Sequence, residues 1–166
     1  MTSSPARVAS APAHPPAPVC RLAASGDELS AHFAVRRRIF VDAQRLFGRD
    51  DRDARDDDPG TLHAVAVVAG EVVGAVRLYA LDAAGLWKGD RLAVLPGARA
   101  HRLGGRLVEF AVRTGGARGG ERMVAQVQVG NVRFFERLGW VAEGAPAPYH
   151  GVMHQPMAIA LRAPAR

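Results

Sequence analysis

The sequence contains little cysteine, few aromatic residues and no long apolar run. Cys20 is the one cysteine among 166 residues, so no disulfide can form within the chain, and a reducing, cytoplasmic location is expected. Aromatic residues make up 6% of the chain and are not interleaved with a basic stripe, which argues against a nucleic-acid partner. No apolar run is long enough to span a membrane, so no membrane partner is expected either.

The chain does contain enough apolar material for one core. Apolar residues make up 48% of its 166 residues, which suits a single domain. Residues 1–19 are rich in proline and alanine and lack the apolar stretch of a secretory signal, so they are predicted to be a disordered leader, with the domain at residues 20–166. The net charge of +6 comes mainly from arginine, which favours phosphate-bearing or other acidic ligands.

The front half of the domain predicts a strand, a helix and an aspartate-rich loop. The strand is expected at residues 19–25, and the helix after Gly26-Asp27 carries apolar residues at helical spacing from Leu29 as far as Phe47. Arg36 and Arg37 follow Phe33 by three and four residues, so at least one of them lies at the edge of that stripe, where its side chain either extends to solvent or faces a site. Residues 49–60 are predicted to form a solvated loop, and no metal is expected because Arg55 breaks the pattern of a calcium loop.

The rest of the chain predicts a mixed α/β order. Residues 61–81 form two valine-rich strands joined by Gly70-Glu71, a sequence typical of a type II′ turn. A further strand ending at Pro96, a helix, a strand, a short helix capped by Gly139 and two final strands follow. This order predicts an antiparallel front half followed by a strand-helix-strand unit.

The segment "PGARAHRLGGRL" stands between a strand and a helix and has the character of a phosphate-binding loop. Backbone N–H groups at a helix N-terminus bind anions, and glycine lets a ligand approach them. A Walker loop needs a Lys-Ser/Thr pair where Arg106 and Leu107 stand, and the glycine offsets do not fit a dinucleotide fingerprint. Both of those readings are therefore excluded.

This segment resembles the acetyl-CoA pyrophosphate loop of the GNAT acyltransferases. Arg99 takes the leading position of that loop and Gly104 the last, with Arg102 where the first glycine is usual. A second segment, "AQVQVGNVRFFERLGW", is similar to another GNAT signature and lies at a suitable distance. A third, "RRRIFVDAQRLF", resembles the first helix of one GNAT branch and of the autoinducer synthases, with Ala43 in place of glutamate. The resemblance covers about residues 20–162 and is greatest to GNAT-type proteins of nitrilase-associated gene clusters.

The resemblance implies a fold and a set of cofactor-binding residues. The implied fold is an α/β (α+β) GNAT fold, with a mixed, mostly antiparallel sheet of six to seven strands, splayed parallel strands 4 and 5 and flanking helices. The implied co-substrate is acetyl-CoA. The residues implied to bind it are Leu92, Ala93, Val94, Arg99, Ala100, His101, Arg102, Leu103, Gly104, Gly105, Arg106, Asn131, Phe134 and Phe135.

The catalytic residues are less clearly indicated. Asp90 and His154 are the candidate bases, with Glu143 a weaker third, because an amine must lose its proton before it attacks a thioester. Many relatives carry a tyrosine that protonates the leaving thiolate, but Phe135 has no hydroxyl, and the nearest other phenols are Tyr79 and Tyr149.

The acceptor pocket is assigned to three side chains, each of which could instead pack in the sheet: Arg77, Trp87 and Arg91. His63, in a valine-rich strand, is predicted to be a core histidine with its hydrogen bonds satisfied, and nothing beside Cys20 indicates a lowered thiol pKa.

The expected function is transfer of an acetyl group from acetyl-CoA to the primary amine of an unidentified small molecule. Two alternatives stay open: a catalytically silent acyl-CoA-binding module, and an acyltransferase that uses longer acyl chains. Dimers are frequent among GNAT relatives, so a homodimer is also an open expectation.

Overall fold

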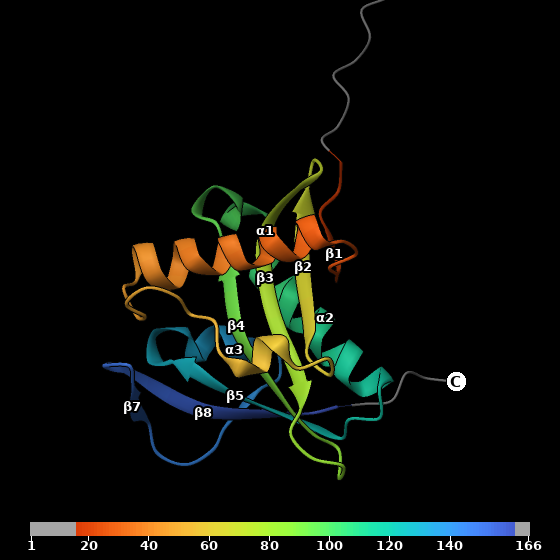
Figure 1. Ribbon diagram of the computed structural model, residues 1–166. Coiled ribbons are helices and arrows are strands. Elements are labelled where there is room, and N and C mark those ends of the chain that lie inside the picture. Colours follow the sequence, from red (N-terminus) through yellow and green to blue (C-terminus); the bar gives the residue numbers. More distant parts are fainter. Residues whose placement is uncertain (1–15, 162–166) are drawn as a thin grey trace, which may run out of the picture.

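An eight-stranded sheet forms the centre of the structure, a computed structural model that describes residues 16–161 (Figure 1). The strand order is β1-β2-β3-β4-β5-β8-β6, and β7 also pairs with β8. Most of the predicted leader lies outside the described residues, but Val19 already belongs to the first strand. None of the helices within residues 16–161 is long and apolar enough to cross a membrane.

The elements have the following bounds. The strands are β1 (Val19–Leu22), β2 (Leu62–Val68), β3 (Glu71–Ala80), β4 (Leu86–Val94), β5 (Arg122–Gln128), β6 (Val141–Ala142), β7 (Ala147–Tyr149) and β8 (Val152–Ala160). The α-helices are α1 (Gly26–Arg37), α2 (Leu103–Ala117) and α3 (Val132–Arg137). A π-helical segment (Arg38–Ala43) continues α1, and 3-10 turns occupy Ala54–Asp57, Pro96–His101 and Val129–Asn131.

The sheet confirms the predicted mixed architecture. Every pairing is antiparallel except that of β4 with β5. These two parallel strands pair only where Leu86–Lys88 meets Arg122–Val124, and beyond that point they separate. The strand count exceeds the predicted six to seven because β7 is a three-residue strand in a segment rich in alanine and proline, which has no strand signal of its own.

The two faces of the sheet are covered by different helices and have different chemistry. On the α2 face, Val76 and Leu78 of β3 pack with Leu103 and Leu107 in the larger apolar core. On the α1 face the apolar cluster is smaller, and buried charged side chains lie beside it. Because side chains alternate along β3, Ala75 and Arg77 face α1, whereas Val76 and Leu78 face α2.

Two local predictions were wrong. The β2–β3 turn consists of Ala69 and Gly70, both with positive φ (51° and 82°), which is type I′ geometry rather than a type II′ turn at Gly70-Glu71. The first helix does not reach Phe47: α-helical geometry ends at Arg37, and the π-helical segment ends at Ala43. A π-helical turn inside a helix often marks a functional site, and Phe40 on this turn contributes to the cavity described next.

Candidate active site

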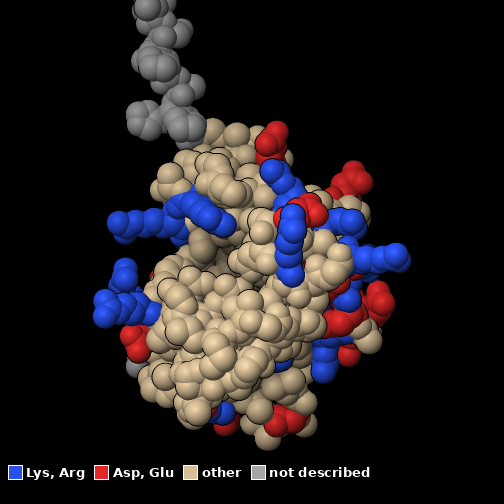
Figure 2. Space-filling view, turned by 90° about the vertical axis from the view of Figure 1, so that its left-hand side faces the viewer, with Lys and Arg blue, Asp and Glu red and all other residues tan. Residues whose placement is uncertain are grey.

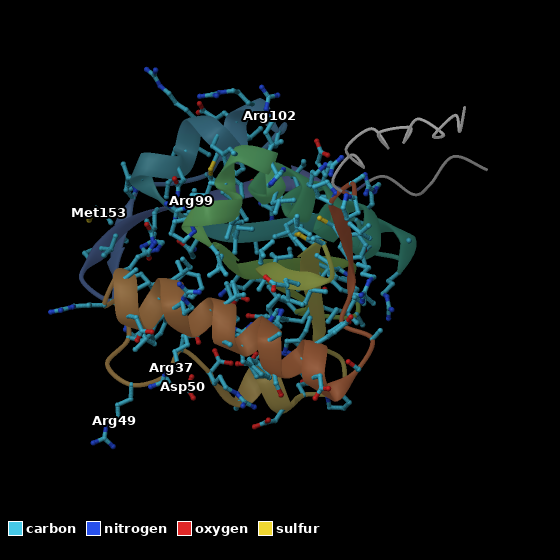
Figure 3. The ribbon with its side chains drawn as sticks, turned by 90° about the horizontal axis from the view of Figure 1, so that it is seen from above. Arg37, Arg49, Asp50, Arg99, Arg102 and Met153 are labelled. Carbon is cyan, nitrogen blue, oxygen red and sulfur yellow. The ribbon has the colours of Figure 1, made fainter. Side chains whose placement is uncertain are left out.

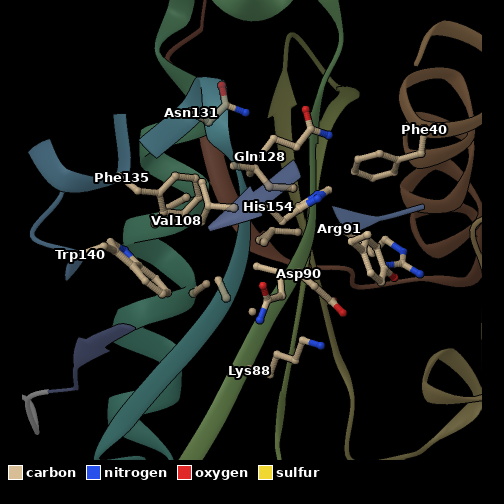
Figure 4. Close-up of a pocket in the computed structure, with 18 of the residues that line it drawn as sticks. Phe40, Lys88, Asp90, Arg91, Val108, Gln128, Asn131, Phe135, Trp140 and His154 are labelled. Atoms are coloured by element: carbon tan, nitrogen blue, oxygen red, sulfur yellow. The ribbon is translucent and has the colours of Figure 1, made fainter. Parts of the chain in front are cut away.

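A cavity of about 150 Å³ lies where β4 and β5 separate (Figure 4). One arm of this cavity is formed by residues near the end of α1 and by the β7–β8 hairpin, and includes Phe40, Leu46, Phe47, Tyr149 and His154. The other arm lies toward α2 and α3 and is lined by Val108, Ala111, Met123, Ala125, Val127, Phe135 and Trp140. We call these the α1 arm and the α2 arm. The cavity thus passes through the sheet at the gap between its two parallel strands.

An open groove leads from the start of α2 to this cavity. Its walls contain most of the residues predicted to bind the cofactor: Leu92, Ala93, Val94, Arg99, Arg102, Gly104, Gly105, Arg106, Asn131, Phe134 and Phe135. The groove and the cavity share Gln44, Leu92, Gln128, Asn131 and Phe135, so the two spaces are continuous. Basic side chains border the hollowed part of this face of the molecule (Figure 2).

The start of α2 presents backbone donors to the groove. The first intrahelical bond there is Arg106 N–H to Arg102 O, so the N–H groups of residues 103–105 have no helical partner, and of these residues Gly104 and Gly105 line the groove. Arg102 adopts a left-handed conformation (φ 54°, ψ 32°), the geometry that the glycine usual at this position would adopt without strain. Figure 3 shows Arg99 and Arg102 on the segment that joins β4 to α2. This end of the groove is suited to a phosphate group.

Three residues predicted for this loop do not line the groove. Ala100 and His101 are exposed on the 3-10 turn, and Leu103 is fully buried in the core beneath it. Arg106 lines the groove, but its Nη1 donates to the Pro18 carbonyl at 3.1 Å. Arg99 and Arg102 line the groove on the segment between β4 and α2, and neither guanidinium group has a protein partner among the described residues.

A bulge in β4 brings Asp90 and Arg91 to the same face of the sheet. Regular alternation would separate them, but between Ala75 and Arg77 of β3 the partner strand advances by an extra residue. Arg91 has a φ of 55° at this point. Asp90 lines the cavity, yet its Oδ1 and Oδ2 each accept a bond from Arg77 at 2.7 Å. Asp90 is thus paired with Arg77 on the cavity wall.

His154 lies on the cavity wall with one ring nitrogen committed to the backbone. It is 5% exposed, and its Nδ1 lies 2.7 Å from the Val152 carbonyl, which can only accept. Nδ1 therefore carries the hydrogen, and the neutral ring keeps its lone pair on Nε2. The Tyr149 ring packs edge-on against the imidazole at 5.2 Å. Of the two predicted bases, His154 is the one whose acceptor nitrogen has no protein partner in the described part of the chain.

Arginines and aspartates on the α1 face, several of them buried, form a network beside the cavity. Its members are Arg36, Arg77, Arg91, Asp51, Asp53, Asp56 and Asp90. Arg36 is fully buried and binds Asp51 through Nε and Asp56 through both terminal nitrogens, at 2.7–3.0 Å. We call this set the arginine–aspartate network.

The network corrects two sequence-based expectations. The aspartate-rich loop is not simply solvated, since Asp51 is 1% and Asp56 8% exposed. Arg36 neither reaches solvent nor faces the cavity. Burial raises the pKa of the Asp56 carboxyl, but hydrogen bonds from His63 and Arg36 outweigh it and hold that pKa well below its usual range. Both partners of the central pair are therefore charged in the folded protein.

The network holds one wall of the cavity in place. Arg91 donates to the Asp51 carbonyl at 3.0 Å, and its guanidinium lies over the Phe47 ring at 4.7 Å. Phe47 also contacts Tyr149 and His150 of the opposite hairpin. The loop that follows the π-helical segment is therefore connected both to β4 and to the segment that carries His154.

The remaining sequence-based candidates lie away from the cavity. Arg77 is 1% exposed and engaged in the network, and Trp87 packs in the core beside Gly115 and Gly120. Glu143 is exposed and paired with Arg122. Of the three side chains predicted for the acceptor pocket, Arg91 alone lines the cavity.

Three other side chains have separate environments. His63 contacts Asp56 at 3.2 Å, as a satisfied core histidine should. Burial and the charge of Asp90 raise the pKa of Tyr79 to about 12, and its hydroxyl donates to Asp90 at 3.3 Å. Burial also raises the pKa of the Cys20 thiol.

Several cavity residues were not predicted. Phe40, Phe47, Gln44 and Gln128 line it, and the amides of Gln44 and Gln128 bond to each other at 2.9 Å across the mouth of the groove. Trp140 forms part of the α2 arm. The "RRRIFVDAQRLF" motif contains three of them: Phe40, Gln44 and Phe47. The motif was the signal for this segment, but it does not show which of its side chains face the cavity.

His32, beside the network, makes the stability of the fold pH-dependent. Burial and the Arg36 charge lower its pKa from 6.5 to about 3, and its Nδ1 donates to the Ala64 carbonyl. Below pH 6.5 the His32 imidazole binds a proton in the unfolded chain, whereas in the folded chain it stays neutral until the pH nears 3. The free energy of unfolding therefore falls as the pH drops from 6.5 toward 3. We expect this residue to lower the unfolding free energy by about 2 kcal/mol between pH 7 and pH 5.

Urea unfolding of His32→Asn at the two pH values tests this expectation. Asparagine retains a donor for the Ala64 carbonyl but cannot titrate, so the pH-dependent loss should shrink by about 2 kcal/mol. His101→Asn, a change at an exposed histidine, should leave the loss as it is in the parent protein. An unchanged loss in His32→Asn would show that the buried ring does not set the slope.

The chain is similar to known proteins over most of its length. Residues 28–140 match the sequence model of the acetyltransferase (GNAT) family. No curated protein matches the chain. Among solved structures, a candidate N-acetyltransferase from Lactobacillus plantarum is similar at a TM-score of 0.77 and 22% identity, over 88% of this chain and 99% of that one.

Two further structures have the same fold. An acyl-CoA N-acyltransferase from Pseudomonas aeruginosa gives a TM-score of 0.73 and 23% identity, over 88% of this chain and 98% of its own. The CoA-dependent acyl-homoserine lactone synthase BjaI, solved with SAM and isopentyl-CoA, gives a TM-score of 0.71 and 21% identity, over 86% of this chain and 82% of its own.

Proposed function

The chain belongs to the acetyltransferase (GNAT) family, and from this premise we propose that it transfers an acyl group from acyl-coenzyme A to the primary amine of a small molecule. The observation that carries the proposal is the continuous path from the start of α2 to His154, through the gap between β4 and β5. The path has anion donors at one end and an unpaired imidazole nitrogen at the other, as this reaction requires.

The groove residues would hold the coenzyme. The free N–H groups at the start of α2, with Arg99 and Arg102, would bind the pyrophosphate by charge-assisted hydrogen bonds. Leu92, Ala93 and Val94 at the free edge of β4 would hold the pantetheine arm, and Asn131 and Phe134 the opposite side. Acyl-coenzyme A supplies the activated thioester, and no metal is required for the attack by an amine.

His154 would act as the general base. Its Nε2 lone pair accepts a proton from the attacking amine, while the bond from Nδ1 to the Val152 carbonyl holds the ring and stabilises the charged form. Tyr149, which also lines the cavity, is the nearest phenol for protonating the leaving thiolate. Phe135 cannot perform that step and packs against Trp140 and Phe134 instead.

A second candidate is an acyltransferase that prefers groups longer than acetyl. The α2 arm favours it, because seven side chains enclose space on the far side of the gap from the α1 arm. The likeness to BjaI, itself solved with isopentyl-CoA, concerns the fold, so the cavity is what supports this candidate.

Calorimetric titration with coenzyme A tests the cofactor assignment. We expect the parent protein to bind it, and Arg99→Ala and Arg102→Ala each to weaken binding by about 10- to 100-fold, because each removes charged donors to a phosphate. Arg118→Ala removes the same charge at the opposite end of α2 and should leave the affinity nearly unchanged. An equal loss in all three variants would indicate a general charge effect, and a parent protein without measurable binding would refute the assignment.

Catalysis is tested separately, by incubating acyl-CoA with a panel of amines and following release of the thiol. Turnover with any amine separates an enzyme from a silent acyl-CoA-binding module, which would bind the coenzyme without releasing it as free thiol. The likeness to nitrilase-associated members, the cytoplasmic location and a homodimer remain predictions.

A further inference from the structure

Lys88 is the one lysine in the chain, among 22 lysine and arginine residues, and it lines the cavity. All the others are arginines, whose guanidinium groups stay protonated and do not attack a thioester. A lysine amine that has lost its proton is a nucleophile toward carbonyl carbon. The one side-chain primary amine of the protein therefore lies in the space where the acyl group would be transferred.

Lys88 stands at the point where β4 and β5 separate. It is the last residue of β4 that pairs with β5, opposite Val124, and the gap between the strands opens beyond it toward Leu92. A pantetheine arm that entered from the start of α2 would follow this gap toward Lys88 with its thioester end foremost. Figure 4 shows Lys88 beside Asp90, on the other side of the gap from Trp140.

The Lys88 amine is not committed to another side chain. The residue is half-buried, and no residue within 16–161 forms an ion pair or a hydrogen bond with its Nζ. Asp90, the acid on the cavity wall, has both carboxylate oxygens bonded to Arg77 at 2.7 Å, and the Tyr79 hydroxyl donates to one of them as well. The amine is therefore available to a ligand in the cavity.

We propose that Lys88 is a modification site, which takes an acyl group from the acyl-coenzyme A bound by the same chain. This inference rests on the proposed function, since it takes the thioester to lie in the gap between β4 and β5. The ammonium first gives a proton to water, and Nζ then attacks the thioester carbonyl carbon. A C–N bond forms as the C–S bond breaks, and a second proton passes from the nitrogen to the departing sulfur. The products are an Nε-acyl-lysine and free coenzyme A.

Intact-protein mass spectrometry tests this inference, with the full chain incubated with acetyl-CoA or butanoyl-CoA in a buffer free of primary amines. We expect one acyl group per chain, which peptide mapping places on Lys88. The rate should saturate at the acyl-CoA concentrations that saturate binding, because the bound thioester is the donor. Lys88→Arg retains the positive charge but has no amine, so it should stay unmodified over the same time.

Arg118→Lys is the matched control. It adds an exposed lysine at the far end of α2, away from the cavity. Lys88 should be acylated at least about tenfold faster than this new amine, because a bound thioester is held beside it. Equal rates at the two positions would indicate chemical acylation from solution and would overturn the inference. If the parent protein binds coenzyme A but Lys88 stays unmodified, the inference fails and the proposed function stands. If coenzyme A does not bind, both proposals fail.

Discussion

Replacing Arg36 by methionine is expected to lower the free energy of unfolding by about 3–5 kcal/mol. The arginine is fully buried and makes three hydrogen bonds to the side chains of Asp51 and Asp56, themselves 1% and 8% exposed. Methionine fills much of the space but leaves two carboxylates without their strongest partner. Equilibrium unfolding in urea at pH 7 measures the loss, and thermal unfolding gives an independent reading.

Arg21→Ala is the control for this prediction. Arg21 also binds a carboxylate, that of Glu28, but the two side chains are 40% and 22% exposed, so the loss should be much smaller than that of Arg36→Met. The contrast between the two variants isolates the effect of burial from that of charge. A loss below about 1 kcal/mol in Arg36→Met would mean that the buried aspartates find other partners, and that the network does not hold the loop.

Replacing His154 by asparagine is expected to reduce kcat by about 10²- to 10⁴-fold. The asparagine amide can still donate to the Val152 carbonyl, as Nδ1 does at 2.7 Å, but it has no atom that replaces Nε2 as a base. The KM for acyl-CoA should change little, since the proton transfer belongs to the transition state. Steady-state release of the coenzyme A thiol, with the best amine of the panel, provides both constants.

His150→Asn tests whether this loss is specific. His150 lies on the same hairpin, is exposed and does not line the cavity, and asparagine tolerates its positive φ of 47°. Its kcat should stay close to that of the parent protein. If His154→Asn retains near-normal kcat while binding coenzyme A normally, the base is another group, and Asp90 becomes the residue to test.

The sequence was most informative where local pattern determines local structure. The glycine-rich segment after Pro96 begins a helix as predicted, and the valine-rich strands and the parallel β4–β5 pair are present. Arg102 stands where glycine is usual, and its backbone still adopts the left-handed geometry that glycine would adopt. The conformation of the loop is therefore retained, at some cost in backbone strain.

The sequence was least informative where function depends on contacts between distant segments. Asp51 can be buried because Arg36, 15 residues earlier, binds its carboxylate. Helical spacing alone does not show that the Arg36 side chain points toward this loop. Arg77 and Arg91 occupy similar places on neighbouring strands, yet one is hidden in ion pairs and the other lines the cavity. A bulge in β4 places Asp90 and Arg91 on the same face of the sheet. No residue in the segment "WKGDRLAV" predicts that bulge.

The two arms of the cavity are built from segments that lie far apart in the chain. Residues 40–47 and the final hairpin enclose one arm, whereas residues 108–140 enclose most of the other. Substitutions that reshape one arm therefore leave the lining of the other largely untouched. Descendants of this protein could therefore change the shape of one arm by substitutions in its own segments while the other arm keeps its lining.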